Sequence, residues 1–158
     1  MRVEYINPFV EASFNVLKEV LGTEVKRGDL FLKSSTMQIM GVAALVGLAG
    51  DVEGRVLFDM TKDTALAVAS GMNGEEMKAM DEMVKATITE LANMITAQAV
   101  TKLHDLGFKF DLTPPALFTG DNMEISNNLE VEALIVPMEL SGGKDGKIEI
   151  NVVIRERS

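Results

Sequence analysis

The feature that most constrains the fold is one long amphipathic segment, residues 81–106, which is followed directly by Gly107. Its apolar residues recur three or four positions apart, the spacing that places them on one stripe of an α-helix. A helix with a single apolar face packs that face against a core, and a glycine suits the end of such a helix. The stripe consists of Val84, Ile88, Leu91, Ile95, Ala99, Leu103 and Leu106.

An earlier helix is predicted near the start of the chain. Asn7 suits an N-cap and Pro8 suits a first helical turn, so the helix is expected to open there. Gly22 stands where a left-handed residue would end it. The apolar positions between these points are Val10, Phe14, Leu17 and Leu21.

Apolar runs separated by glycine-rich turns predict strands. Residues 50–56 and 142–148 share a pattern: Gly, three residues, Gly, a basic residue and a β-branched one. Each stretch joins two apolar runs and follows an amphipathic helix, which suggests two related helix-plus-hairpin halves, although similar turn chemistry alone would give the same match. The expected strands are residues 37–48, 55–60, 116–118, 129–140 and 147–155, with a helix over 62–72 that Thr61 caps and Asn73-Gly74 ends.

These elements predict a single α+β domain over residues 1–158, with a mostly antiparallel sheet and a few helices. Because hydrophobic residues make up 47% of the chain but aromatic residues only 5%, the core is expected to be aliphatic, filled partly by the 11 Met. The chain has no Cys, so disulfides and thiolate metal sites are excluded.

Charge and hydropathy limit the partners and the location. The formal net charge is −9, which argues against nucleic acid because phosphate backbones bind Lys and Arg. No stretch at the start has the pattern of a signal peptide. The longest apolar stretch, residues 37–49, is too short to span a bilayer. A cytoplasmic protein without membrane insertion is expected.

Several kinds of chemistry are poorly supported. His104 is the only histidine, whereas a zinc site usually needs several His or Cys ligands. No Ser stands in a nucleophile-elbow pattern, and no phosphate-binding loop is present. His104 is better explained by favourable placement near a helix C-terminus. No metal or cofactor of the chain's own is expected.

The outer side of the long helix carries a polar pair, Glu90 and Asn93. At 100° per residue, measured from Val84, Asn93 falls at roughly 180° and Glu90 at roughly 240°, away from the apolar stripe. Ala86 and Ala97 bracket the pair along the helix axis. Two polar side chains between small neighbours would suit docking against another protein, with Ala86 and Ala97 letting the partner approach.

The pair has useful chemistry for such docking. A carboxamide donates and accepts hydrogen bonds at once, so it could hold a water in line with a phosphorus atom without titrating. A carboxylate could pair with a lysine. Glu and Asn three residues apart also occur on many helices by chance, so spacing alone leaves a functional role open.

The stretch Glu90-Leu91-Ala92-Asn93-Met94, with Leu106-Gly107 and Asp111-Leu112-Thr113-Pro114-Pro115 after it, resembles the signature of the CheC/CheX/FliY phosphatases. That family carries Glu, two residues and then Asn on a long helix, and a Pro a little over twenty residues later. The resemblance extends over essentially the whole chain. In the first helix Glu11 and Asn15 are four apart, so a single motif is present, as in the CheX branch.

The resemblance implies a CheC-like fold and removal of the aspartyl phosphate from CheY or a CheY-like receiver domain. Asn93 would insert into the receiver's site and orient the attacking water. Glu90 would pair with the receiver's lysine. Mg²⁺ is expected on the receiver, and a homodimer joined through sheet edges is implied. One position departs from the pattern: Ala86 stands where the family often has Asp or Ser.

Two other functions stay open from the sequence. A non-catalytic adaptor of the same fold would bind a receiver domain or another signalling partner, and Ala86 gives this alternative weight. A small-ligand sensor is the other, since Met residues can line an adaptable pocket. Met37, Met40 and Met138 are more simply explained as core residues.

Overall fold

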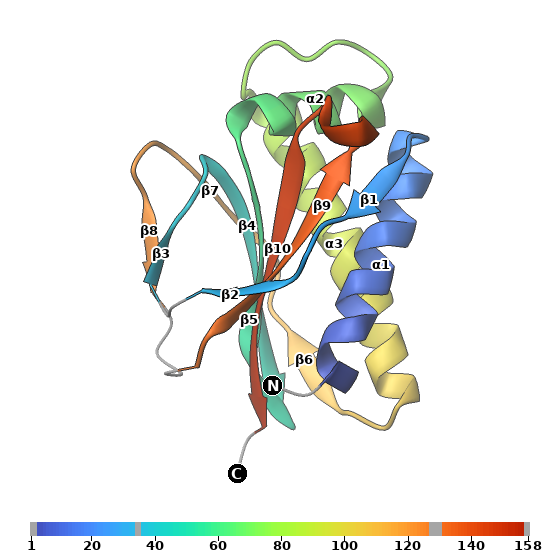
Figure 1. The fold of residues 1–158 in the computed structure, drawn as a ribbon, viewed down its shortest axis with the longest axis vertical. Helices are drawn as coiled ribbons and strands as arrows, with labels where there is room; N and C mark the ends of the chain where they lie inside the picture. Colours follow the sequence, from blue (N-terminus) through green and yellow to red (C-terminus); the bar gives the residue numbers. More distant parts are fainter. Residues whose placement is uncertain (1–2, 34–35, 127–130, 157–158) are drawn as a thin grey trace.

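The computed structural model describes residues 3–33, 36–126 and 131–156. Helices α1 and α3 lie side by side on one face of an antiparallel sheet, and α2 packs across one end (Figure 1). The elements in chain order are α1 (Val3–Leu21), β1 (Val25–Arg27), β2 (Phe31–Lys33), β3 (Thr36–Gln38), β4 (Val42–Gly50), β5 (Val52–Met60), α2 (Lys62–Asn73), α3 (Glu82–Asp105), β6 (Phe110–Leu112), β7 (Ala116–Thr119), β8 (Glu124–Ser126), β9 (Ala133–Leu140), the 3-10 turn η1 (Ser141–Gly143) and β10 (Lys147–Glu156).

The main sheet has the strand order β1-β9-β10-β5-β4-β6, with β2 also paired to β9 and β7 also paired to β4. Every pairing among the described strands is antiparallel, which confirms the predicted α+β class. The hairpins β4–β5 and β9–β10 meet at the centre, where Val56 lies opposite Val152. Each hairpin belongs to the half of the chain that begins with α1 or α3, so the predicted duplicated arrangement is visible in the topology.

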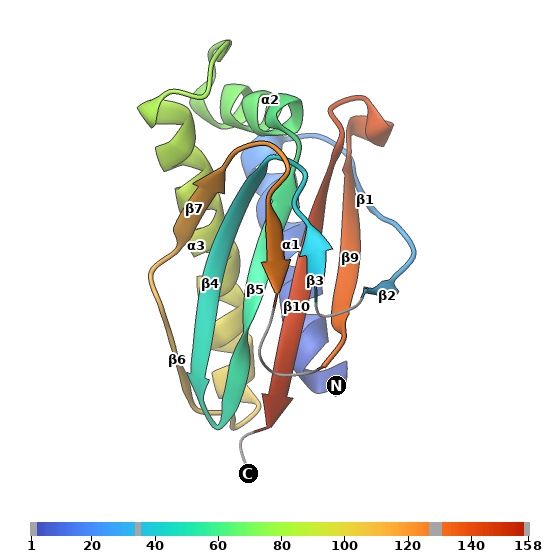
Figure 2. The same ribbon diagram turned by 90° about the vertical axis from the view of Figure 1, so that its left-hand side faces the viewer.

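Alternation along the central strands places one aliphatic face against the helices. Phe58 on β5 and Ile150 on β10 face α1 and α3 and are buried. On α3 the predicted stripe is buried from Val84 to Leu103, whereas Leu106, the last predicted member, is 59% exposed. The opposite face of the sheet carries the β3–β8 ribbon, visible in front of the sheet in Figure 2. The core is therefore aliphatic, as predicted, and α3 is held in one rotation about its axis.

The predicted start of the first helix is wrong. The structure begins the helix at Val3, so Pro8 lies inside it rather than in its first turn. Proline removes one backbone hydrogen bond there. Burial of Tyr5 and Ile6 offsets this loss, since both side chains are less than a tenth exposed. Phe14, predicted to be on the apolar side, is 37% exposed, whereas Gly22 ends the helix in the left-handed region as predicted.

Two strand predictions also need correction. The single strand expected over residues 37–48 is two strands, β3 and β4, separated by a bend at Gly41 with φ of 145°. The strand expected to begin at Arg55 begins at Val52, and Gly54 lies within it. A Cβ at Gly54 would come within 1.9 Å of the Val153 carbonyl oxygen, so the glycine permits close strand approach rather than a turn.

The remaining predicted elements agree closely with the structure. Thr61 caps α2 by accepting a hydrogen bond from the Thr64 amide at 3.1 Å, and Gly74 ends that helix. Strands β7 and β10 match their predicted ranges to within one residue. The expected beginning of the strand at Leu129 lies outside the described residues, and β9 is described from Ala133.

Candidate functional site on helix α3

Helix α3 is fixed at both ends by local hydrogen bonds. The Asp81 carboxylate accepts a hydrogen bond from the Val84 amide at 3.0 Å, which caps the N-terminus. At the other end the Gly107 amide donates to the His104 carbonyl at 2.9 Å, with Gly107 at a φ of 96°. These contacts set the length of the helix, and its buried stripe sets which side faces outward.

The outward side of α3 is a continuous exposed stripe. Its members are separated by three or four residues, so they stand one above another along the helix. Leu91 and Ile95 lie on the opposite side and are fully buried, which prevents the stripe from turning inward. The stripe consists of Ala86, Glu90, Asn93, Ala97, Thr101 and His104. The structure therefore brings Glu90 and Asn93 together on an exposed face, as predicted.

The side chains of Glu90 and Asn93 are free to form hydrogen bonds with solvent or with another molecule. Within the described ranges, neither side chain makes a hydrogen bond or an ion pair. The neighbouring Thr89 and Thr101 hydroxyls instead donate to carbonyls one turn earlier, at 2.8 and 3.0 Å. The pair is thus a carboxylate and a carboxamide, both solvated, on a rigid helix.

Ala86 and Ala97 lie one turn before and one turn after the pair, and both are exposed. Their methyl groups leave the polar side chains standing above the helix surface. His104 closes the stripe near the C-terminus, where its ring packs edge-on against Phe110 with centroids 5.6 Å apart. This contact agrees with the structural role expected for His104.

A shallow groove runs beside the N-terminal half of α3. It has a volume of about 320 Å³ and lies between the helix and strand β7, which Figure 2 shows next to the upper part of α3. Pro115 leads directly into β7, and the strand then presents alternate side chains toward the helix. We call this the α3–β7 groove; it is lined by Glu82, Lys85, Ala86, Thr89, Leu117 and Thr119.

The α3–β7 groove shares Ala86 with the exposed stripe, so it adjoins the Glu90–Asn93 pair. The sequence did not reveal it, because Leu117 and Thr119 are about thirty residues from Ala86 and reach it only through the pairing of β7 with β4. Near this strand, the sequence offered only the proline pair Pro114-Pro115, which indicates a break before β7 but not a groove.

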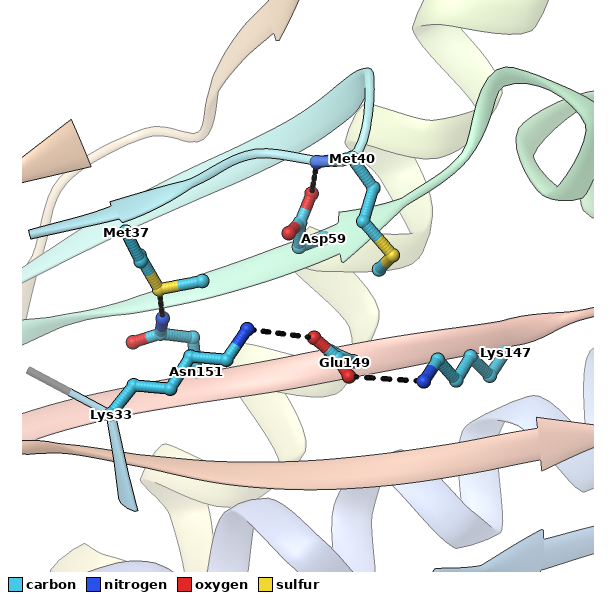
Figure 3. Close-up of polar contacts among 7 residues, drawn as sticks. All are labelled: Lys33, Met37, Met40, Asp59, Lys147, Glu149 and Asn151. Atoms are coloured by element: carbon cyan, nitrogen blue, oxygen red, sulfur yellow. Dashed lines mark hydrogen bonds and ion pairs between the residues drawn. The ribbon is translucent and has the colours of Figure 1, made fainter. Parts of the chain in front are cut away.

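A second polar group lies on the other face of the sheet, beneath the segment that contains β3. Figure 3 shows Asp59 on β5 and Glu149 on β10, which are directly opposite in the strand register. Glu149 forms ion pairs with Lys33 at 3.6 Å and Lys147 at 3.3 Å. The Met40 amide donates to Asp59 Oδ1 at 3.0 Å.

Burial and, to a smaller extent, the nearby Glu149 carboxylate raise the pKa of Asp59 to about 6, although the Met40 amide and Lys33 act in the opposite direction. Asp59 is fully buried, and its Oδ2 has no hydrogen-bond partner among the described residues. The signal in the sequence was a carboxylate inside the apolar run Val56–Met60, which matches no functional motif. This cluster is on the sheet face opposite α3, so it is separate from the exposed pair.

Among the described residues, no group of three or more His, Asp or Glu side chains is placed to hold a metal ion. No helix within those residues is both long and apolar enough to cross a membrane.

Solved structures define the class of protein. A CheC-like superfamily protein from Shewanella sp. PV-4 is 29% identical with a TM-score of 0.87, covering 98% of this chain and 99% of that one. The CheX component of a CheX–CheY–BeF3–Mg²⁺ complex from Borrelia burgdorferi is 49% identical with a TM-score of 0.83, covering 98% and 100%. The fold is therefore CheC-like.

Sequence comparison gives the family within that class. Residues 42–139 match the family model described as chemotaxis phosphatase CheX. The CheY-P phosphatase CheX of Thermotoga maritima is 30% identical over 128 residues, which is 80% of this chain and 83% of that protein. The chain belongs to the CheX family of chemotaxis phosphatases. This confirms the family expected from the Glu90-Leu91-Ala92-Asn93 motif.

Proposed function

We propose that this chain removes the phosphoryl group from the phosphorylated aspartate of a CheY-like receiver domain, with Asn93 and Glu90 as the catalytic residues. The observation that carries the proposal is the exposed pair on α3, whose side chains make no hydrogen bond or ion pair within the described residues. The family membership supports the same substrate, since one relative is a CheY-P phosphatase and another was solved bound to CheY.

In this mechanism the receiver supplies the phosphorylated aspartate and Mg²⁺, and this chain supplies the side chains that position the attacking water. The Asn93 carboxamide accepts a hydrogen bond from a water and holds it in line with the phosphorus atom, as a Gln does in GTPases. The water oxygen bonds to phosphorus as the bond to the receiver's aspartate breaks. The products are inorganic phosphate and the free carboxylate.

Glu90 stands one turn before Asn93 on the same stripe. On docking, its carboxylate would pair with the receiver's active-site lysine and fix the approach of Asn93. A rigid helix suits this task because a small displacement of an orienting group lowers the rate strongly. No bond to an atom of this chain forms at any step, so neither a nucleophile nor a metal of its own is required.

The experiment uses receiver domains from the same genome, phosphorylated with acetyl phosphate, and follows loss of the phosphoryl group. Wild-type chain is expected to accelerate the loss, and Asn93→Ala to reduce the acceleration by about 10²-fold. Asn15→Ala is a matched control, because Asn15 is an exposed Asn on α1 and should leave the rate unchanged. No acceleration by the wild type on any receiver would refute the proposal.

A receiver-binding adaptor is the second candidate function. Ala86 favours it, because this exposed position lacks the polar side chain that the family often has there. The same assay separates the two functions when it is combined with a binding measurement. Binding of a phosphorylated receiver without faster loss of its phosphoryl group would establish the adaptor.

We further propose a cytoplasmic homodimer joined through a sheet edge. We propose the cytoplasmic location because the proposed substrate is a receiver domain. At one edge of the main sheet, the segment around β2 exposes three consecutive large apolar side chains: Leu30 at 41%, Phe31 at 37% and Leu32 at 58%. Exposed apolar residues on an edge strand favour association with another strand. Sedimentation of the wild type should give a dimer, and Leu32→Lys should shift it toward the monomer.

A further inference from the structure

The α3–β7 groove adjoins the proposed catalytic pair, and its position follows from helix geometry. Ala86 is four residues before Glu90, which is about 6 Å along the helix axis. Ala86 is seven residues from Asn93, about 10 Å, so a receiver domain whose phosphoryl group reaches Asn93 is close enough to cover the groove as well. The inference below rests on the proposed function and specifies how the partner is selected.

We infer that the α3–β7 groove receives an uncharged side chain of the receiver domain, next to the phosphorylation site, and that Ala86 keeps the groove open for it. Ala86 and Leu117 supply the apolar part of the lining, and the other four residues supply its polar part. A volume of about 320 Å³ leaves room for a side chain together with part of the backbone that carries it.

The polar atoms of the groove do not favour a charged occupant. Lys85 and Glu82 at its rim form an ion pair at 3.6 Å, so their charges largely cancel. The Thr89 hydroxyl donates its hydrogen to the Lys85 carbonyl at 2.8 Å. An uncharged side chain can therefore enter without leaving a charge unpaired.

Strand β7 adds a second means of contact. It pairs with β4 on one side, and among the described strands none pairs with its other side. Backbone donors and acceptors on that free edge lie beside the groove. A receiver segment that places a side chain over Leu117 could also form backbone hydrogen bonds there, which would fix its direction.

The test fills the groove from the helix side. Ala86→Leu and Ala86→Gln add similar bulk with different polarity, and neither should disturb the helix strongly. Both are expected to raise KM for the phosphorylated receiver by about tenfold or more, by steric exclusion, while kcat stays within about twofold. The dissociation constant for a receiver carrying beryllofluoride should rise by the same factor.

Two further variants make the result specific. Thr119→Leu fills the groove from β7 and should act in the same direction, without any change in α3. Thr101→Leu adds bulk to the same exposed stripe fifteen residues from Ala86, about 22 Å along the helix, and should leave KM and binding unchanged. Thermal unfolding by circular dichroism checks that each variant is folded.

The outcomes distinguish this inference from the proposed function. If wild-type chain is active and both Ala86 variants keep the wild-type KM and dissociation constant, the groove does not contact the receiver and the inference is overturned alone. If wild-type chain neither binds the beryllofluoride receiver nor accelerates phosphate loss, the proposed function fails and the inference fails with it. Raised KM and weakened binding in both Ala86 variants, with Thr101→Leu unaffected, would support it.

Discussion

Replacing Asp59 by Asn is expected to stabilise the fold near neutral pH and to destabilise it in acid. Asp59 is fully buried on the sheet face opposite the helices, directly across from Glu149 (Figure 3). Its Oδ1 accepts the Met40 amide, whereas Oδ2 has no hydrogen-bond partner within the described residues. An ionised carboxylate in this position is costly, since burial disfavours the charged form.

The pKa of Asp59 gives the size of the effect. Burial, aided by Glu149, raises it from 3.8 to about 6, a difference of about two units. Each unit corresponds to 1.36 kcal/mol, so the ionised folded protein is destabilised by at most about 3 kcal/mol relative to the protonated form. Because the folded state holds this proton more tightly than the unfolded chain, stability falls as pH rises from about 4 to about 6.

Asn cannot ionise, so the variant loses this pH-dependent contribution. Its carbonyl oxygen can still accept from Met40, and its amide group takes the place of Oδ2, which has no hydrogen-bond partner among the described residues. An imperfectly satisfied amide costs about 1–3 kcal/mol, which offsets part of the gain. We therefore expect Asp59→Asn to raise the free energy of unfolding by up to about 2 kcal/mol at pH 7.5, and to lower it at pH 4, where the cost of the amide is no longer offset.

Urea denaturation of wild type and variant at several pH values between 4 and 7.5 measures this directly. The difference between the two proteins is the informative quantity, because contributions from the other acidic groups cancel in it. Asp111→Asn is the matched control for loss of one negative charge at an exposed position in a chain of net charge −9. A difference that stays constant across the pH range, or is larger in acid, would refute the account of Asp59.

Three other changes test the fold. Gly54→Ala should prevent folding or destabilise severely, because a Cβ there meets the Val153 carbonyl oxygen at 1.9 Å; the yield of folded protein and its melting temperature report this. Asp81→Ala should cost about 1 kcal/mol in urea denaturation, through loss of the cap on α3. Ile95→Ala should cost about 2–5 kcal/mol, since the side chain is fully buried between α3 and the sheet, and a loss below 1 kcal/mol would contradict that packing.

The parts of the fold that were predicted correctly are those with strong local signals. Helix α3 has a long periodic stripe and a glycine after its end, and its range is right to within one residue. Helix α2 has a Thr cap and a Gly stop. The same periodicity placed Glu90 and Asn93 on the exposed side. Such signals involve residues within one or two helical turns of each other, so they can be recognised without knowledge of the tertiary structure.

The parts that were missed depend on contacts between distant residues. Helix α1 extends before Pro8 because Tyr5 and Ile6 find a core to enter, which the local sequence does not show. Strands β1, β2 and β6 have three residues each, too few for an alternating pattern, and exist because β9 and β4 offer partners. The α3–β7 groove likewise arises from strand pairing.

For the candidate site, helical periodicity predicted where Glu90 and Asn93 lie, and family resemblance suggested the phosphatase chemistry. Neither could show that Ala86 borders a groove, since Leu117 reaches it through β7. If the receiver docks as inferred, the small side chain of Ala86 keeps this part of the surface open.

The central claim is that Asn93 acts in the chemical step rather than in binding. The most direct test is a single-turnover measurement of phosphate loss from a phosphorylated receiver at saturating concentrations of wild type and of Asn93→Ala, alongside the affinity of each for the beryllofluoride receiver. We expect the rate with Asn93→Ala to be lower by about 10²-fold, with affinity changed by no more than a few-fold. Equal single-turnover rates for the two proteins would contradict the account.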